Sequence, residues 1–151
     1  MEWPEKFEIK NYRFKNSMKL TINTDGGARG NPGPAGIGVV VQDESGKIIG
    51  SHKNYIGETT NNVAEYKALI LGLTEAAKLG ANELTVNMDS ELVVKQMQGR
   101  YKIKEPGLQA LAQEVFKLTK NFKSVSFCHV YREKNKAADK LVNEAIDQAT
   151  A

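Results

Sequence analysis

Apolar residues recur first at every second position and later at every third or fourth, and the order of these two patterns limits the folds open to the chain. Leu20, Ile22 and Thr24 alternate as in a strand with two different faces. A glycine- and proline-rich loop over 26–34 and a turn over 44–47 then separate further alternating segments. The first part therefore predicts three hairpin-linked strands, which end at Asp25, at Gln42 and near Ile56.

Helical spacing begins at Asn61 and continues to Gly80, which is a natural stop for a helix. A buried strand is expected over 84–88, with a short helix capped by Ser90 after it. Further along, the pattern predicts a longer helix after Pro106-Gly107, a strand over 125–131 and a last helix capped by Asn135. This order predicts a mixed α/β (α+β) protein with a five-stranded sheet flanked by helices.

The chain has 151 residues, which suits one domain, and 40% hydrophobic with 26% charged residues is ordinary for a soluble protein. It shows neither an apolar run of bilayer length nor a secretory signal pattern at its start. Cys128 is the single cysteine, which excludes an internal disulfide and fits a reducing compartment. We therefore expect a cytoplasmic, monomeric protein without membrane contact. The net charge of +3 by itself indicates no more than a mixed, solvated surface.

Residues 1–17 differ from the rest, because basic residues alternate there with Phe7, Ile9, Tyr12 and Phe14. This segment is expected to be an added arm or hairpin that precedes a domain over 18–151. Alternatively, its basic and aromatic side chains provide an accessory nucleic-acid-binding segment.

Four acidic residues stand where a side chain can leave the scaffold toward a common site. Asp25 and Asp89 are expected at strand ends, and Glu65 and Asp139 near helix N-termini. Each has an ordinary explanation when taken alone, as a turn residue, a cap or a charge that suits the helix dipole. Ligands of open sheets bind beyond the carboxyl ends of the strands, so the four acids together predict one site.

Four carboxylates in one site repel each other strongly unless a cation neutralises them. Hard oxygen ligands favour Mg²⁺ or Mn²⁺ over Zn²⁺, and the sequence has no Cys/His cluster for a softer metal. Such a site suits cleavage of phosphodiesters with two metal ions.

These acids lie within four longer motifs. The motifs are Thr24-Asp25-Gly26-Gly27-Ala28 with Gly30-Asn31-Pro32-Gly33, then Thr60-Asn61-Asn62-Val63-Ala64-Glu65, then Met88-Asp89-Ser90, and then Arg132-Glu133-Lys134-Asn135-Lys136-Ala137-Ala138-Asp139. They resemble the motifs of type 1 ribonuclease H, in the short-loop form common in archaea and many bacteria. The resemblance extends from about Met18 to the C-terminus, with the motifs in the order of that family.

The resemblance implies a ribonuclease H-like fold with strand order 3-2-1-4-5. It also implies a Mg²⁺-dependent endonuclease that cuts the RNA strand of RNA–DNA hybrids and leaves 5′-phosphate and 3′-hydroxyl ends. Asp25 would bridge two metal ions, Asp139 would complete the site of the ion that activates water, and Glu65 and Asp89 would serve the other. Glu65 would also contact a ribose 2′-hydroxyl, which distinguishes RNA from DNA.

The same resemblance implies a set of substrate contacts. Asn31, Asn61 and Asn62 would face the minor groove of the hybrid, where short amides can donate and accept hydrogen bonds. Thr60 would contact a phosphate. Helix capping by Thr60 and Asn61, and an ordinary turn at Asn31, are the alternatives. The expected substrate-binding residues are Gly26, Gly27, Asn31, Thr60, Asn61, Asn62, Ser90 and Asn135.

The chain departs from the family pattern at three places. Arg132 stands near the position of a loop histidine that assists product release in many bacterial members, so Arg132 is either a catalytic cation or a surface ion-pair residue. His129 alternates with strand residues and is read as structural. The basic protrusion of some members is replaced by the short segment 99–106, and Glu91 stands where a neutral amide is common.

Several other functions compete with this one. A related exonuclease or integrase-like enzyme would use the same carboxylates on other nucleic acids, and double-stranded RNA remains a possible substrate. A hybrid-binding module without catalysis would be expected to lack at least one of the four acids. The glycine-rich loop is a poor nucleotide cradle, because no Gly-Lys-Ser/Thr ending follows it.

Overall fold

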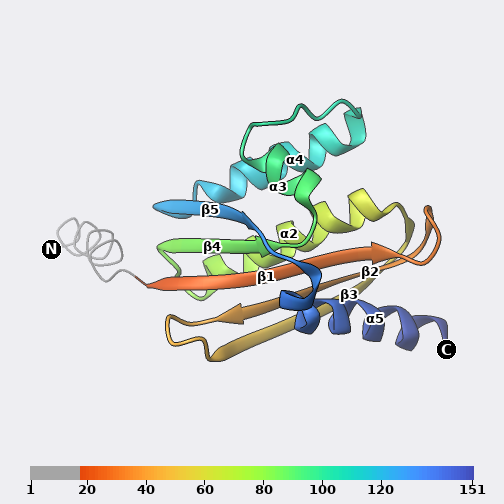
Figure 1. Ribbon diagram of the computed structural model, residues 1–151, viewed down its shortest axis with the longest axis horizontal. Helices are drawn as coiled ribbons and strands as arrows, with labels where there is room; N and C mark the ends of the chain where they lie inside the picture. The colour runs from red at the N-terminus through yellow and green to blue at the C-terminus, as the bar shows by residue number, and fades with distance from the viewer. Residues whose placement is uncertain (1–17) are drawn as a thin grey trace, which may run out of the picture.

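The computed structural model describes residues 18–151, so the expected arm over 1–17 lies outside the described residues. Figure 1 shows the described elements in order along the chain. The strands are β1 (Lys19–Ala28), β2 (Gly33–Gln42), β3 (Ile48–Thr59), β4 (Glu83–Met88) and β5 (Ser124–His129). The helices are α2 (Asn61–Lys78), α3 (Glu91–Met97), α4 (Pro106–Thr119), the short 3₁₀ helix η1 (Arg132–Lys134) and α5 (Lys136–Thr150).

The five strands form one mixed sheet in the order β3-β2-β1-β4-β5, as the resemblance implied. β1 pairs with β2, and β2 with β3, in antiparallel hairpins. β4 lies parallel to β1 on its other edge, and β5 lies parallel to β4. The sheet is therefore antiparallel in its first half and parallel in its second half.

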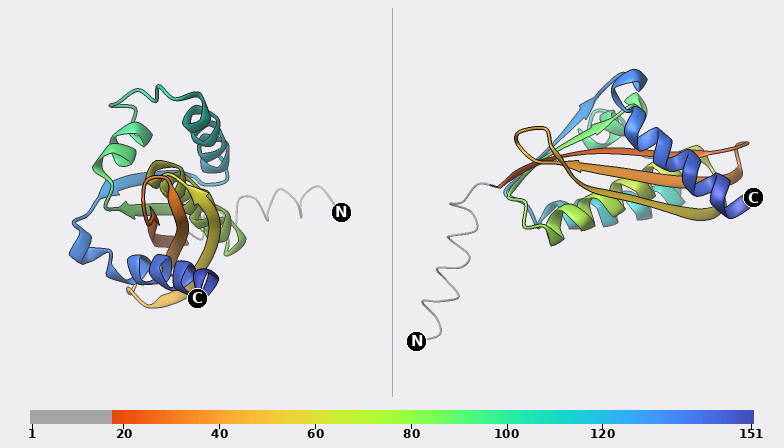
Figure 2. Two further views of the ribbon diagram at one scale, coloured as in Figure 1. Left: turned by 90° about the vertical axis from the view of Figure 1, so that its right-hand side faces the viewer. Right: turned by 90° about the horizontal axis from the view of Figure 1, so that it is seen from below.

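Helices cover the two faces of the sheet, with α2 on one face and α5 on the other (Figure 2). The side chains of Ile22 and Val39 point toward α2, where they lie beside Gly72. The alternate positions Gly36 and Gly38 face α5. The main apolar core, which includes Leu69 and Val86, lies on the α2 side of the sheet.

The first strand is longer than its sequence pattern indicated. It continues beyond Asp25 to Ala28, because Gly27 and Ala28 pair with Gly36 and Ala35 of β2. The expected loop over 26–34 is therefore reduced to 29–32, and the expectation that the strand ends at Asp25 was wrong. Glycine is uncommon inside strands, and here the hairpin partner supplies the pairing that the local sequence does not favour.

Two other boundaries differ slightly. Pro106 is the first residue of α4 instead of preceding it. Proline suits this position because a backbone N–H there would have no partner within the helix. β3 extends to Thr59, directly before the N-cap of α2. None of the helices in the described range, 18–151, is long and apolar enough to cross a membrane.

Candidate active site

Asp25 and Asp89 meet at the carboxyl end of the parallel strand pair. The register of β1 and β4 ends with Thr24 opposite Met88, and the two aspartates are the residues that follow this pair along the chain. β1 continues from there with β2 alone, so Asp25 stands where the parallel pairing stops. This edge is where open sheets of this kind bind ligands, as the sequence predicted.

Glu65 reaches the same edge from the second turn of α2. A Cβ atom on Gly26 would collide with the backbone of Ala64 and come within 2.6 Å of the main-chain nitrogen of Glu65. The glycine after Asp25 therefore lets β1 approach the helix backbone, and this approach brings the two acids together.

Asp139 enters from α5 on the opposite face of the sheet. Gly38 of β2 is the antiparallel partner of Asp25, and a Cβ on Gly38 would lie 2.5 Å from the carbonyl oxygen of Ala138. The absence of a side chain there lets the first turn of α5, which carries Asp139, lie against the strand.

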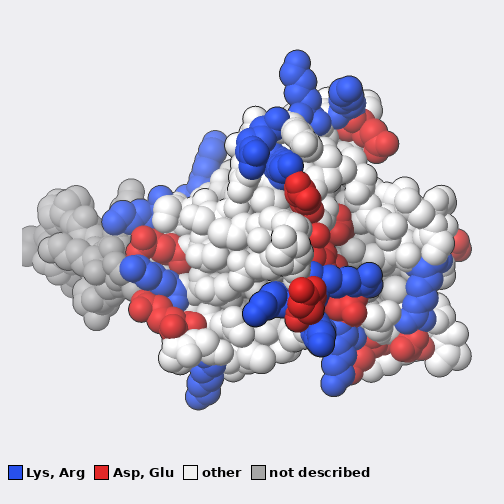
Figure 3. All heavy atoms as spheres, viewed as in Figure 1, with Lys and Arg blue, Asp and Glu red and all other residues white. Residues whose placement is uncertain are grey.

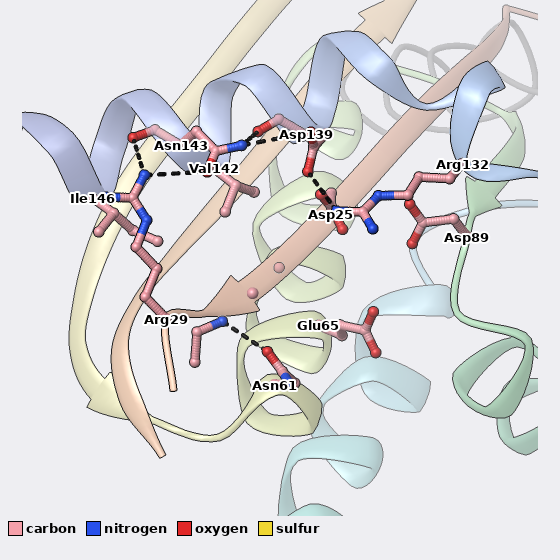
Figure 4. A pocket seen from close by; sticks show the side chains of 13 residues that line it. Asp25, Arg29, Asn61, Glu65, Asp89, Arg132, Asp139, Val142, Asn143 and Ile146 are labelled. Carbon is pink, nitrogen blue, oxygen red and sulfur yellow. Dashed lines mark hydrogen bonds and ion pairs between the residues drawn. The ribbon is translucent and has the colours of Figure 1, made fainter. Parts of the chain in front are cut away.

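The four acids line one open cavity of about 500 Å³. Asp25, Glu65 and Asp89 each offer a carboxylate oxygen, and these oxygens all lie within 4.8 Å of one another. Asp139 lines the same cavity, close enough to Asp25 for the two carboxyl groups to interact. Figure 4 shows the side chains converging from β1, α2, the end of β4 and α5. In Figure 3, acidic atoms gather at the centre of one face and basic side chains surround them.

Burial and mutual repulsion change the protonation of this cluster. The pKa of Asp25 is raised from 3.8 to about 8, first by burial and then by the charges of Asp89 and Asp139. Burial also raises the pKa of Glu65 from 4.5 to about 7, although a hydrogen bond from Ser90 acts in the opposite direction. Without a cation, the folded protein therefore keeps protons on these carboxyl groups near neutral pH. A bound cation would neutralise the charge of the ionised carboxylates instead.

This donor set fits a divalent cation that prefers oxygen ligands. Three carboxylate oxygens within 4.8 Å of one another can coordinate the same ion, and Asp139 lies beside them. Carboxylates are the preferred ligands of Mg²⁺ and Mn²⁺. The cluster of Asp25, Glu65 and Asp89 thus fits a metal ion, and the expectation that all four acids serve one metal site stays a prediction.

Two of the expected substrate contacts use their amide oxygens inside the protein. The Oδ1 of Asn61 accepts a hydrogen bond of 2.8 Å from the N–H of Ala28. The Oδ1 of Asn31 accepts one of 3.0 Å from the N–H of Asn61. Both amides are thereby oriented, since only the oxygen can accept from an N–H, and their NH₂ groups remain as donors at the rim of the site.

Thr60 and Ser90 are helix caps, as the sequence indicated. The Oγ1 of Thr60 accepts from the N–H of Val63 at 3.2 Å, and the Oγ of Ser90 accepts from that of Val93 at 3.3 Å. Ser90 in addition contacts Glu65. The remaining expected contacts include Gly26 and Gly27, which line the cavity, and Asn62, which lies half-buried in the first turn of α2.

The position of Asn135 does not suit the two roles expected of it, which are substrate binding and side-chain capping of the last helix. Its side chain is only 1% exposed, which leaves no surface for a substrate. It stands at the N-cap position of α5, but its side-chain oxygen accepts no capping bond. Its Nδ2 donates to the carbonyl oxygen of Thr24 at 2.9 Å. The expectation of a side-chain cap was therefore wrong, and the residue instead connects β1 to α5.

Arg132, His129 and Glu91 are the residues at which the chain departs from the family pattern or for which a structural role was expected. Arg132 lines the cavity with a side chain that is 82% exposed, and its Nη2 lies 3.8 Å from the Oδ1 of Asp139. His129, expected to be structural, is exposed at the end of β5, where its ring meets that of Tyr131 edge-on at 5.7 Å. Glu91 forms an ion pair of 2.6 Å with Lys95 one helical turn away, which offsets its additional negative charge.

Sequence reasoning missed two polar residues of the cavity wall, Arg29 and Asn143. Arg29 follows β1, and Asn143 stands one helical turn after Asp139 on α5. The four-residue spacing was a visible signal for Asn143, whereas the sequence held no sign that Arg29 would reach α5.

Comparison with known proteins gives one consistent result. A family described as reverse transcriptase-like matches residues 23–145. The bifunctional protein Rv2228c of Mycobacterium tuberculosis is 49% identical over 133 residues, which are 87% of this chain and 36% of that protein. The ribonuclease HI of Halobacterium salinarum is 42% identical over 125 residues, which are 83% of this chain and 63% of the archaeal one. The chain thus spans about a third of the length of the mycobacterial relative.

Solved structures of related proteins also superpose closely on this chain. LC11-RNase H1 in complex with an RNA/DNA hybrid superposes with a TM-score of 0.84 at 52% identity, over 87% of this chain and 99% of that chain. RNase H1 of Halobacterium salinarum gives 0.84 at 39% identity, over 86% of this chain and 98% of that chain.

The strand order, the helices on both faces and the carboxylate cluster at the parallel edge define a ribonuclease H-like protein. Within that class, the identities and the coverage of whole solved domains place the chain more narrowly. It belongs to the type 1 ribonuclease H family, which its four motifs resembled.

Proposed function

We propose that this chain hydrolyses the RNA strand of RNA–DNA hybrids internally, leaving 5′-phosphate and 3′-hydroxyl ends. The observation that carries the proposal is the convergence of Asp25, Glu65 and Asp89 oxygens within 4.8 Å, with Asp139 beside them. The hybrid bound by the similar LC11 enzyme supports the choice of substrate.

Asp25, Glu65, Asp89 and Asp139 would hold two Mg²⁺ ions, for which Mn²⁺ could substitute. When bound, such ions supply the charge that activates an attacking water and stabilises the leaving oxygen. The protein contributes placement, because its carboxylates come from strands and helices packed rigidly against one another. Glu65, held by Ser90, would in addition accept a hydrogen bond from the ribose 2′-hydroxyl that DNA lacks.

The amides at the rim suit the minor groove of a hybrid. The oxygens of Asn31 and Asn61 are used internally, so both residues present N–H donors to the substrate. Every base pair offers acceptors in the minor groove, so donors there bind without demanding a particular sequence. Asn62, Gly26 and Gly27 would complete this surface, and Thr60 would contact a phosphate.

Arg132 would act as the mobile cation near the leaving phosphate. Its side chain is 82% exposed and held by one contact of 3.8 Å, so it can move without disturbing the fold. The alternative, a plain surface ion pair with Asp139, predicts that its removal leaves turnover unchanged.

The decisive experiment uses a hybrid with labels on both strands, with and without Mg²⁺. We expect internal cleavage of RNA only, its loss in EDTA, and its loss in Asp25→Asn with hybrid binding retained. Cleavage of the DNA strand, or activity that persists in EDTA, would contradict the proposal. Binding without any cleavage would favour a non-catalytic hybrid-binding module, and a parallel assay on double-stranded RNA tests that further substrate.

The wider biological setting follows from the sequence and stays a prediction. We propose a cytoplasmic monomer whose catalytic domain spans 18–151 and whose segment 1–17 is an extension. Size-exclusion chromatography with light scattering tests the monomer, and comparison of the full chain with a variant that begins at Met18 tests whether the extension aids hybrid binding.

A further inference from the structure

Three polar residues of α5 lie on one face of the helix, in line with the carboxylate cluster. Asp139, Asn143 and Asp147 follow each other at intervals of four residues, which places them one turn apart on the same side. Asp139 belongs to the proposed metal site, whereas Asn143 and Asp147 extend the line away from it. The proposed hydrolysis assigns no role to these two residues.

Arg29 crosses from the loop between β1 and β2 to this face of α5 (Figure 4). Its Nη1 lies 2.6 Å from the Oδ1 of Asp147. Its Nη2 donates to the Oδ1 of Asn143 at 3.2 Å and lies 3.4 Å from the carbonyl oxygen of Asn143. A planar guanidinium that contacts two residues one turn apart is restrained in both position and orientation.

The contact with Arg29 determines which way the amide of Asn143 points. Its oxygen faces the guanidinium, so its Nδ2 faces back along the helix and donates to the carbonyl oxygen of Asp139 at 3.1 Å. The same Nδ2 lies 3.5 Å from the Oδ2 of the Asp139 carboxylate. Arg29 cannot accept a hydrogen bond, so the opposite orientation would place NH₂ against the guanidinium and an oxygen against the carboxylate.

We propose that Asn143, oriented by Arg29, is a positioning residue for the carboxylate of Asp139. This inference rests on the proposed function, in which Asp139 is a metal ligand. The side chain of Asp139 is 34% exposed, and Arg132 approaches only its Oδ1. Asn143 supplies a donor for Oδ2, and this neutral contact limits the rotation of the carboxylate without adding charge to the site. Contacts of this kind around a metal ligand commonly affect metal affinity or activity by about 10- to 100-fold.

The test compares Arg29→Met, Asn143→Ala and the double variant, with Lys53→Met as the matched control. Lys53 of β3 forms a similar ion pair with Glu144 of α5 at 3.6 Å, away from the site. We expect Arg29→Met and Asn143→Ala each to lower kcat on the hybrid about tenfold. The double variant should be no worse than Asn143→Ala, because Arg29 acts through Asn143. Lys53→Met should retain normal turnover.

Two further measurements separate positioning from simple stabilisation. Asn143→Asp keeps the shape and the contact with Arg29 but replaces the donor by an acceptor, so it should fold normally and lose turnover. In the metal-free protein, the side-chain amide signals of Asn143 in NMR spectra should be well dispersed in the wild type and in Lys53→Met, and averaged in Arg29→Met.

Several results would overturn the proposal. These are normal turnover in Asn143→Asp, additive losses in the double variant, and unchanged amide signals in Arg29→Met. A wild-type protein that fails to cleave hybrid would refute the proposed function instead, and the NMR comparison would still show whether Arg29 orients Asn143.

Discussion

The side-chain amide of Asn135 donates a hydrogen bond of 2.9 Å to the main-chain carbonyl oxygen of Thr24, a residue 111 positions earlier in the chain. Thr24 directly precedes Asp25. The main-chain carbonyl oxygen of Asn135 accepts from the N–H of Asp139 at 3.1 Å. One buried residue, through its side chain and its backbone, therefore links the strand and the helix that carry two of the four carboxylates.

Removing this link should destabilise the protein and lower turnover. Asn135→Ala leaves a buried carbonyl without its partner, which typically costs about 1–3 kcal/mol of unfolding free energy. Urea denaturation measures that loss, and steady-state kinetics should show a reduced kcat. Asn62→Ala serves as the contrasting variant, with normal stability and a raised KM for hybrid. An Asn135→Ala protein with normal stability and only a raised KM would instead indicate direct substrate contact.

Gly26→Ala should abolish most activity, because the added Cβ collides with the backbone of α2 at Ala64 and forces Glu65 away from Asp25. Overpacking of this kind typically costs about 1–3 kcal/mol, and backbone offers less relief than a side chain does. Thermal unfolding and the cleavage assay measure both effects. Gly107→Ala is the control, since its Cβ would meet nothing within 4 Å and should leave activity intact. Full activity in Gly26→Ala would show that the close approach is unnecessary.

Stability without divalent cations should fall as the pH rises. The pKa of Asp25 in the folded protein is about 8 and that of Glu65 about 7, both above their ordinary values of 3.8 and 4.5. The folded state therefore holds protons that the unfolded state releases, so this contribution is full below about pH 4 and is lost by about pH 8.

Urea denaturation in EDTA at pH 5.5 and at pH 8.5 measures this dependence in the wild type and in Asp25→Asn. The variant should show a smaller decline, because it keeps a neutral group at the most strongly perturbed position. Mg²⁺ should stabilise the wild type at the higher pH by binding the folded state, and should stabilise Asp25→Asn less. Equal pH dependence in the two proteins would contradict the assignment of the raised pKa.

Arg132→Ala should lower steady-state turnover while the first turnover stays nearly normal, because a mobile cation near the leaving phosphate would act on product release. A comparison of burst and steady-state rates distinguishes the two steps. Lys134→Ala removes the same charge from the same 3₁₀ helix and is the matched control. If both variants behave like the wild type, Arg132 is a surface ion-pair residue and has no part in catalysis.

Much of the fold was predictable because apolar periodicity is a local property. The strand around Ile22, the long helix through Leu69 and the amphipathic last helix were all visible in the sequence. The continuation of β1 through Gly27 was not visible, since glycine carries no strand preference and the pairing with β2 decides its conformation.

The candidate site divides in the same way. Asp25, Glu65, Asp89 and Asp139 were identified from their motifs and from their expected places at strand ends and helix starts. The directions of Asn31, Asn61 and Asn135 depend on partners far along the chain, as does the reach of Arg29 to a residue 114 positions away. A short polar side chain has several possible partners, and only the packed structure selects among them.

The sequence by itself determined the order of strands and helices, the family and the four carboxylates, because these are carried by local spacing and by contiguous motifs. The tertiary structure alone decided how closely the carboxylates meet, which amide atoms of Asn31 and Asn61 are used inside the protein, and which partners Asn135 and Asn143 contact. The carboxylates meet because β1 approaches α2 closely at Gly26 and β2 approaches α5 closely at Gly38. Such contacts join segments that are far apart in the sequence, so no local pattern of residues predicts them.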